Sequence, residues 1–103
     1  MYDSIKDWLD VPLYVRKFDK RDGAGDKQFK STVLVDTYPV IETKYVRNQL
    51  GAEVLSNSHF YMDGTTDISI MDEVQFDDGD WLQILSIEVF YRNGRPDLKV
   101  VYT

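Results

Sequence analysis

A chain of 103 residues, 43% of them hydrophobic and 14% aromatic, can build one small core but not two. It contains no cysteine, which excludes disulfides and thiolate metal sites and agrees with a reducing compartment. The net charge of -6 argues against a general affinity for nucleic acid, and no apolar run reaches the roughly 18 residues that a membrane span requires. We therefore expect a single domain over residues 1–103. Because residues 1–10 lack the features of a signal peptide, we expect it to stay in the cytoplasm.

The first ten residues predict a short helix. Asp3 or Ser4 can cap its start, and three apolar side chains spaced i, i+3 and i+4 share one face. The helix should end before Pro12, because the residue preceding a proline disfavours helical geometry. The three apolar residues of that face are Ile5, Trp8 and Leu9.

Two strands are expected next, over residues 13–18 and 31–35, and the second is rich in β-branched residues. Residues 20–27 between them contain Gly23 and Gly25 and have no apolar periodicity. This stretch therefore predicts a mobile loop or the end of a hairpin.

The middle of the chain is less regular. Residues 38–50 predict either a strand with an irregular end or a long loop, opened by Pro39 and closed by Gly51. Residues 53–62 alternate as one strand, and Asp63-Gly64 gives a turn signal after it. We find no internal repeat.

The last third of the chain has the clearest pattern. The turn signals Asp77-Asp78-Gly79 and Asn93-Gly94 separate runs rich in Val, Ile, Phe, Tyr and Trp, which is typical of hairpins. Residues 82–89 are apolar on both faces apart from three positions, which predicts a central strand covered on two sides. The expected structure is an antiparallel meander with strands near 73–77, 80–91 and 97–103.

Few residues offer chemistry. His59 is the one histidine of the chain. The sequence has no cysteine that it could activate and no Gly-x-Ser-x-Gly motif that would supply a serine nucleophile, so we expect His59 to be structural or solvated. Asp77, Asp78 and Asp80 do not have calcium-loop spacing and predict a solvated hairpin tip. Gly23-Ala24-Gly25 lacks the lysine and hydroxyl residue of a Walker motif. We expect no enzyme activity, no metal and no cofactor.

The surface charge is uneven. Residues 52–103 hold three Lys or Arg against ten Asp or Glu, whereas residues 16–30 hold six basic side chains against three acidic ones. That cluster predicts a solvated charged loop, or a docking surface for an acidic partner or for DNA. The aromatic residues are too many for so small a core, so we expect some to meet another subunit. The cluster consists of Arg16, Lys17, Lys20, Arg21, Lys27 and Lys30, with Asp19, Asp22 and Asp26.

Three stretches carry a family resemblance: Gly-Ala-Gly-Asp-Lys-Gln-Phe at residues 23–29, Gly51-Ala52-Glu53-Val54, and residues 72–84. In this order they resemble the phage head-tail joining proteins, which are small head-completion or stopper proteins of long-tailed phages and prophages. In that family an acidic residue, two spaced hydrophobic residues, a glycine, an aromatic and a further hydrophobic residue mark a hairpin late in a small β-barrel. Here the turn has one extra residue, and Trp81 stands where tyrosine is commoner. The matching positions are Asp72, Val74, Phe76, Gly79, Trp81 and Ile84.

We expect an all-β fold: a small antiparallel β-barrel or rolled sheet with a short N-terminal helix and one or two long loops. The resemblance implies a non-catalytic subunit of a ring, expected to be dodecameric, that lies below the portal and adaptor, retains packaged DNA without binding it specifically, and docks the tail proteins. It implies assembly in the host bacterial cytoplasm and a final place at the head-tail interface of the virion.

The resemblance also implies a loop that projects into the channel. Residues 38–50 and 19–30 are the two candidates, and we expect both to be flexible in the free subunit. The candidate channel or interface residues are Asp22, Gly23, Gly25, Lys27, Tyr38, Lys44, Tyr45 and Arg47.

The alternative is a small SH3-like or OB-like binding module that recognises a protein or single-stranded nucleic acid. Exposed aromatics could stack on bases in such a module. The acidic second half of the chain weighs against nucleic acid.

Overall fold

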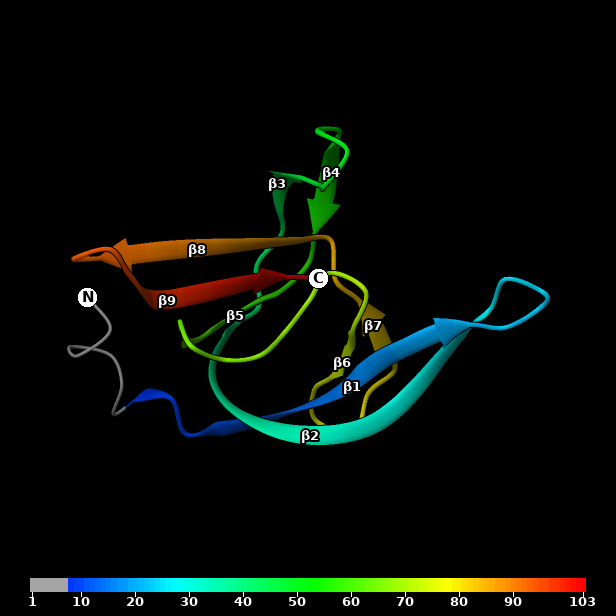
Figure 1. Ribbon diagram of the computed structural model, residues 1–103. Helices are drawn as coiled ribbons and strands as arrows, with labels where there is room; N and C mark the ends of the chain where they lie inside the picture. Colours follow the sequence, from blue (N-terminus) through cyan, green and yellow to red (C-terminus); the bar gives the residue numbers. More distant parts are fainter. Residues whose placement is uncertain (1–7) are drawn as a thin grey trace.

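The computed structural model describes residues 8–103, and its regular elements are β-strands (Figure 1). Seven of the nine described strands form one sheet in the order β7-β6-β1-β2-β5-β9-β8, with every neighbouring pair antiparallel, while β3 and β4 form a separate two-stranded sheet. The larger sheet curls around its core, which confirms the expected rolled antiparallel fold. The strands are β1 (Val11–Arg21), β2 (Lys27–Val40), β3 (Lys44–Arg47), β4 (Glu53–Ser56), β5 (His59–Asp63), β6 (Glu73–Gln75), β7 (Trp81–Gln83), β8 (Ser86–Arg92) and β9 (Arg95–Tyr102).

The curled sheet is an open half-barrel. Its edge strands are β7 and β8, and among the described residues they pair only with β6 and β9, respectively. The predicted N-terminal helix falls largely on residues 1–7, which lie outside the described residues. Of its apolar face, Trp8 and Leu9 are described and neither belongs to an α-helix; β1 begins shortly afterwards, at Val11.

β1 and β2 form a hairpin much longer than the two predicted strands (Figure 1). The stretch expected as a loop or hairpin end is a hairpin end, because Arg21 pairs with Lys27 and the loop shrinks to residues 22–26. Register shifts on either side of Phe18 mark an irregularity in β1, and such bulges let a long hairpin bend.

The prediction of one central strand over residues 80–91 is wrong. The chain breaks at Ile84 and Leu85 into β7 and β8, which lie at opposite edges of the sheet. Ile84 is 3% exposed in the core, and the backbone N–H of Leu85 donates to the carbonyl of Tyr102 at 2.8 Å. The apolar run is therefore a buried corner that passes from one end of the sheet to the other, and periodicity alone does not distinguish it from a buried strand.

β9 has the place that the sequence pattern gave to residues 82–89. It lies between β5 and β8, and side chains on both of its faces are buried: Leu98, Val100 and Tyr102 on one face, Val101 on the other. The turns before it are as predicted, since β6 and β7 pair around Asp77-Asp78-Gly79 and β8 and β9 pair around Asn93-Gly94.

Residues 53–62 are not one strand either. They divide into β4, in the small sheet, and the start of β5, in the large one. The corner between them is polar: the N–H of Asn57 donates to the carbonyl of Thr103 at 3.0 Å, and Ser56 Oγ donates to the carbonyl of Ser58 at 3.0 Å. Residues 38–50 are the end of β2, a short connection and β3, rather than one long loop.

The core fills the concave side of the sheet. Phe60 contacts Phe76, with ring centroids 5.6 Å apart. The predicted turn at Asp63-Gly64 is present, and it packs so closely on β9 that a Cβ at Gly64 would lie 2.5 Å from the backbone of Pro96. The buried cluster consists of Leu13, Val15, Phe60, Met62, Ile68, Val74, Ile84 and Val101.

Candidate functional site: two hairpins that project from the sheet

The candidate interface residues lie on two separate projections. Figure 1 shows the β1–β2 hairpin and the β3–β4 hairpin leaving the body in different directions. The structure therefore does not bring the two candidate stretches together into one site. Asp22, Gly23, Gly25 and Lys27 lie at the end of β1–β2, Lys44, Tyr45 and Arg47 in β3, and Tyr38 within β2.

The β1–β2 hairpin ends in a turn organised by one carboxylate. Asp22 Oδ1 accepts hydrogen bonds from the N–H groups of Ala24 and Asp26, both at 2.9 Å. Gly25 has φ +89°, a left-handed conformation that side chains disfavour. Arg21 Nη1 donates to the carbonyl of Gly25 at 2.9 Å and closes the turn from the strand side.

The β3–β4 hairpin ends in the same turn. Asn48 Oδ1 accepts from the N–H groups of Leu50 and Ala52, both at 3.0 Å. Gly51 has φ +80°, and Arg47 Nη1 donates to its carbonyl at 2.8 Å.

Both turns therefore follow the spacing Arg-Asx-x-x-Gly, which begins at Arg21 in one hairpin and at Arg47 in the other. No internal repeat was expected from the sequence, and this five-residue spacing is a short one that local inspection of the two glycine-bounded turns could have found. The backbone N–H groups of Ala24, Gly25 and Asp26 all donate to Asp22, to its carboxylate or its carbonyl, so the loop has no phosphate cradle ready for a nucleotide.

Tyr38 belongs to an aromatic row on the body. It pairs with Tyr61 across the sheet, with ring centroids 6.2 Å apart, and its ring lies 5.7 Å from that of Trp8. It is 39% exposed, so it contributes to the surface of β2 rather than to a loop.

The base of the β1–β2 hairpin is held to β6 by Arg16. Its guanidinium lies 4.2 Å from the centre of the Phe29 ring and 4.5 Å from that of Trp81, and Nε donates to Glu73 Oε1 at 3.0 Å. Arg16 Nη2 forms a further ion pair with Glu73. The cation is thus enclosed by two aromatic faces and a carboxylate, an arrangement stronger than an exposed ion pair.

A second anchor lies beside it. The buried carboxylate of Asp72 accepts from Lys17 Nζ at 2.6 Å, from the N–H of Phe18 at 2.8 Å and from the N–H of Ser69 at 2.9 Å. Burial alone would raise the pKa of Asp72. The hydrogen bonds from Lys17, Phe18 and Ser69 outweigh burial, so the pKa lies below its ordinary value.

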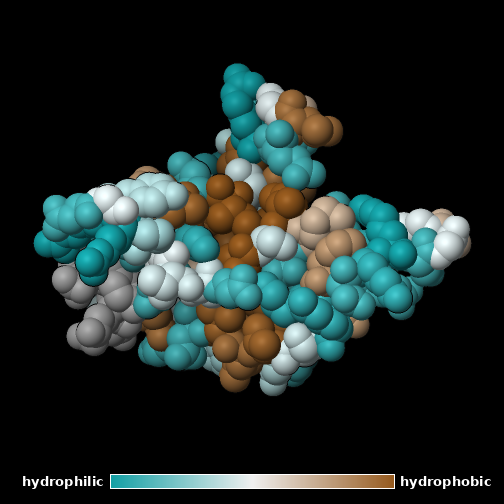
Figure 2. Space-filling view, viewed as in Figure 1, coloured by the Kyte–Doolittle hydropathy of each residue, from teal (hydrophilic) through white to brown (hydrophobic). Residues whose placement is uncertain are grey.

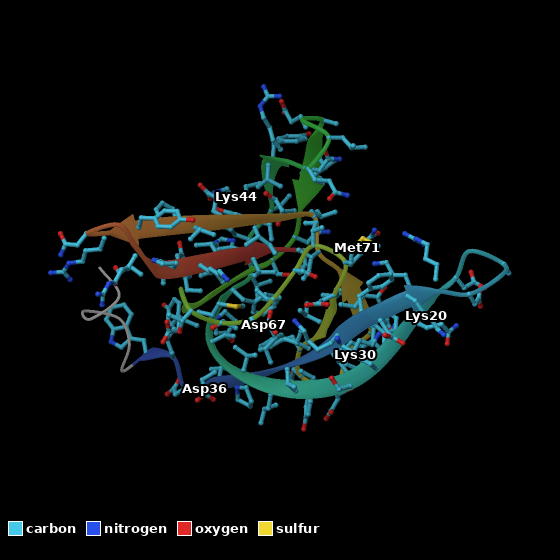
Figure 3. The ribbon with its side chains drawn as sticks, viewed as in Figure 1. Lys20, Lys30, Asp36, Lys44, Asp67 and Met71 are labelled. Atoms are coloured by element: carbon cyan, nitrogen blue, oxygen red, sulfur yellow. The ribbon has the colours of Figure 1, made fainter. Side chains whose placement is uncertain are left out.

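These contacts show that several basic side chains of residues 16–30 are bound within the chain. Arg16 and Lys17 bind acidic residues of the second half of the chain, and Lys27 Nζ donates to the carbonyl of Met71 at 3.1 Å. Figure 3 shows Lys20 and Lys30 along the hairpin, well apart from Lys44 on the other projection. The cluster is largely an internal attachment rather than a basic binding face.

The β3–β4 hairpin exposes apolar side chains. Tyr45 and Leu55 are directly opposite each other in the two strands, 68% and 46% exposed. Leu50 at the turn is 85% exposed. Figure 2 shows apolar atoms at the outer end of this hairpin and where it joins the body.

A second exposed apolar pair lies on the convex side of the β1–β2 hairpin. Tyr14 and Leu34 are opposite each other, 44% and 57% exposed. Figure 2 shows apolar atoms over the bend of β2 as well.

His59 lies under the base of the β3–β4 hairpin and is 3% exposed, so it is structural rather than solvated. Its ring contacts Tyr61 and Tyr102, with centroids 5.5 and 5.3 Å away. Burial lowers the pKa of His59 more than the nearby carboxylate of Glu42 raises it, so the ring is neutral at pH 7.

The acidic turn of β6–β7 is a hairpin tip. Asp77 and Asp78 both have left-handed φ values, +53° and +56°, and the N–H of Gly79 donates to the carbonyl of Phe76 at 3.0 Å. Over residues 8–103, no group of three or more His, Asp or Glu side chains is placed to hold a metal ion. No helix within that range is long and apolar enough to span a membrane.

No protein-family model matches this chain, and no curated protein or solved structure matches it. The resemblance to head-tail joining proteins therefore depends on the residues quoted for it alone.

Proposed function

We propose that this protein is a structural subunit of a phage or prophage head-tail connector. In this role it forms a ring below the portal and adaptor, retains packaged DNA and presents a surface to the tail. The observation that carries the proposal is the pair of projecting hairpins, each with an exposed Tyr-Leu pair, on a curled sheet whose edge strands β7 and β8 have no second partner among the described strands. Such surfaces are typical of a part that is completed by neighbours.

The dimensions of the chain agree with this role. A compact monomer of 12.0 kDa has an accessible surface of roughly 6,000 Å², and this chain has 6514 Å². Its radius of gyration is 13.8 Å, against about 12.8 Å for a compact domain of this length. Hairpins that project from the sheet add surface without enclosing a core, and both values differ in that direction.

The charge distribution also fits a channel. A ring that lets a duplex pass should present few free cations, because each phosphate contact adds to the affinity. Arg16 and Lys17 are already paired with Glu73 and Asp72. With the net charge of -6, this leaves a surface that does not grip DNA.

The binding module remains the rival. Tyr45 and Tyr91 are 68% and 67% exposed, and such rings can stack on bases. However, the two cations that flank Tyr45 are already engaged within the chain, since the ammonium of Lys44 lies 5.3 Å from the centre of the Tyr102 ring and Arg47 donates to the carbonyl of Gly51.

Co-assembly with portal and adaptor proteins from the same genome tests the proposal. We expect the purified subunit to be monomeric or weakly associated alone, since its exposed faces are small and its net charge is negative, and to form a ring on the portal-adaptor complex. Light scattering and electron microscopy give the two readouts, with portal lacking adaptor as the control. A tight, concentration-independent dimer that does not join the complex would overturn the proposal.

A further inference from the structure

We infer that the β3–β4 hairpin of one copy docks on the convex side of the β1–β2 hairpin of a second copy, so that the chain associates head to tail. The hairpin face consists of Tyr45, Leu50 and Leu55, and the sheet face consists of Tyr14 and Leu34. The inference deepens the proposed function, on which it rests for its biological setting, by naming the two surfaces that meet.

The hairpin face needs a cover. Among residues 8–103, β3 and β4 pair only with each other, and an isolated two-stranded hairpin is marginal in water. Its Tyr45-Leu55 pair projects on one face, and Leu50 extends beyond the last strand pair. A natural chain that keeps three large apolar groups on so weakly supported an element is expected to bury them against another surface.

The sheet face offers a matching surface. Beside the Tyr14-Leu34 pair lies a hollow of about 390 Å³. Its lining combines apolar side chains with two aspartates, so it suits a projecting aliphatic group such as Leu50 that has one basic residue, Arg47, at the base of its turn. The hollow is lined by Val11, Pro12, Tyr14, Phe76, Asp77 and Asp78.

The basic residue beside the hairpin face can meet acidic residues beside the sheet face. Arg47 is on the Tyr45 side of β3, with Glu53 opposite it, whereas Lys44 is on the other side and its ammonium lies 5.3 Å from the centre of the Tyr102 ring. The sheet face is bordered by Asp77 and Asp78 in the hollow, and by Asp36, two residues from Leu34 on the same side of β2. Charges of opposite sign at a rim select the partner and its orientation more than they add affinity.

A second copy is the occupant that these features fit, because one chain carries both surfaces. The surfaces are different, so the contact is heterologous and can repeat from copy to copy until a ring closes. Five exposed side chains are far fewer than the about 20 residues a side of a stable interface. The contact should therefore be weak until a template holds the copies side by side.

Cross-linking between two single-cysteine variants tests this, because the chain has no cysteine of its own. Gln49→Cys labels the hairpin turn and Thr32→Cys labels the sheet face, two residues from Leu34 on the same side of β2; both positions are exposed. With a short bismaleimide, we expect a heterodimer from the mixture at least about fivefold more abundant than a homodimer from either variant alone. The matched control pairs Gln49→Cys with Asn93→Cys at the β8–β9 turn, and it should give only collisional background.

Loss of the apolar contact should remove the product. Leu50→Asp in the Gln49→Cys chain changes a side chain that is 85% exposed, so the fold is unaffected, and we expect the heterodimer to fall to background. Strong homodimers of Gln49→Cys alone would show hairpin-to-hairpin contact and overturn the inference. So would a mixture no more reactive than the Asn93→Cys control at millimolar protein.

The inference and the proposed function can fail separately. If the chain joins the portal-adaptor ring but the Gln49→Cys and Thr32→Cys pair does not cross-link there, the connector stands and this contact is wrong. If the pair cross-links in solution but the chain does not bind the portal-adaptor complex, the contact between copies is right and the proposed connector function is wrong.

Discussion

The two projecting hairpins end in the same turn but are supported differently. The β1–β2 hairpin is part of the seven-stranded sheet, and Arg16 and Lys17 attach it to Glu73 and Asp72. The β3–β4 hairpin forms a sheet of its own and keeps the ring of Tyr45 in solvent. The same turn thus ends two different arms: the fixed arm, β1–β2, which ion pairs attach to the sheet, and the β3–β4 arm, whose exposed apolar side chains have no covering surface among residues 8–103.

The difference separates two causes of structure. A turn is determined by a few neighbouring residues, such as an Asx side chain and a left-handed glycine. The stability of the arm behind it comes from residues distant in sequence, as when Asp72 accepts from Lys17 and from the backbone of Phe18. The arm with fewer such attachments is the one that exposes a docking face.

The largest effect should come from Asp72→Asn, which breaks the fixed arm. An amide cannot accept from Lys17 and both N–H groups together, and it removes the buried carboxylate that pairs with Lys17, which among the described residues keeps only its hydrogen bond to the carbonyl of Asp67 and the distant carboxylate of that residue. We expect the free energy of unfolding to fall by about 2–4 kcal/mol, measured by urea denaturation. Asp67→Asn is the control: its side chain is 98% exposed and 3.8 Å from Lys17, so the loss should stay below about 0.5 kcal/mol.

The same anchor should make stability depend on pH. The folded pKa of Asp72 is lowered, so its contribution is fully present above the unfolded pKa of about 3.9 and is lost as pH falls through the folded value. We expect the difference in stability between wild type and Asp72→Asn to be constant above about pH 5 and to narrow below pH 4. A difference that grows toward low pH would contradict the anchor.

Local features of this fold were predictable from sequence, and long-range ones were not. The hairpin turns at Asp77-Asp78-Gly79 and Asn93-Gly94 were predicted because the residues that make them are adjacent. The corner at Ile84 was not, because a buried corner and a buried strand are both apolar on every side. Only tertiary contacts decide between them.

The candidate site shows the same division. Residues such as Arg47 were correctly placed on surface projections, because polar stretches that end at a glycine predict turns at the surface. The sequence could not show how many basic side chains of residues 16–30 are free to bind a partner, because a count of charges along the chain does not reveal that Arg16 pairs with Glu73. The exposed Tyr14-Leu34 pair also escaped notice, since alternation within a strand does not say which face remains uncovered.

The turn glycines give a smaller effect that compares the arms directly. A Cβ at Gly25 or Gly51 would meet nothing within 4 Å, so alanine there costs only the strain of positive φ, about 1–2 kcal/mol. We expect Gly25→Ala to lower global stability. Gly51→Ala should instead open the β3–β4 arm locally, seen as faster trypsin cleavage after Arg47 with global unfolding changed by less than about 0.5 kcal/mol. Equal global losses for both would show that the arms are equally coupled to the sheet.

The smallest expected effect is on DNA binding. It tests whether the basic side chains of the fixed arm are paired within the chain and so cannot bind phosphate. We expect the isolated wild-type subunit to bind neither duplex nor single strands more tightly than about 10 micromolar near physiological salt, where non-specific binders reach roughly 1–100 micromolar.

Removing the internal carboxylate should release those cations. Glu73→Gln removes the carboxylate that pairs with Arg16 and lies near Lys27. We expect DNA binding, measured by fluorescence anisotropy, to strengthen severalfold. The slope of the logarithm of the binding constant against the logarithm of the salt concentration should steepen by about one unit for each cation that is freed. Glu53→Gln changes the net charge equally but lies on the other arm, opposite Arg47, and should change binding less. Submicromolar affinity of the wild type for single strands, lost on Tyr91→Ala, would favour the binding module, because it would show that exposed rings rather than freed cations hold the strand.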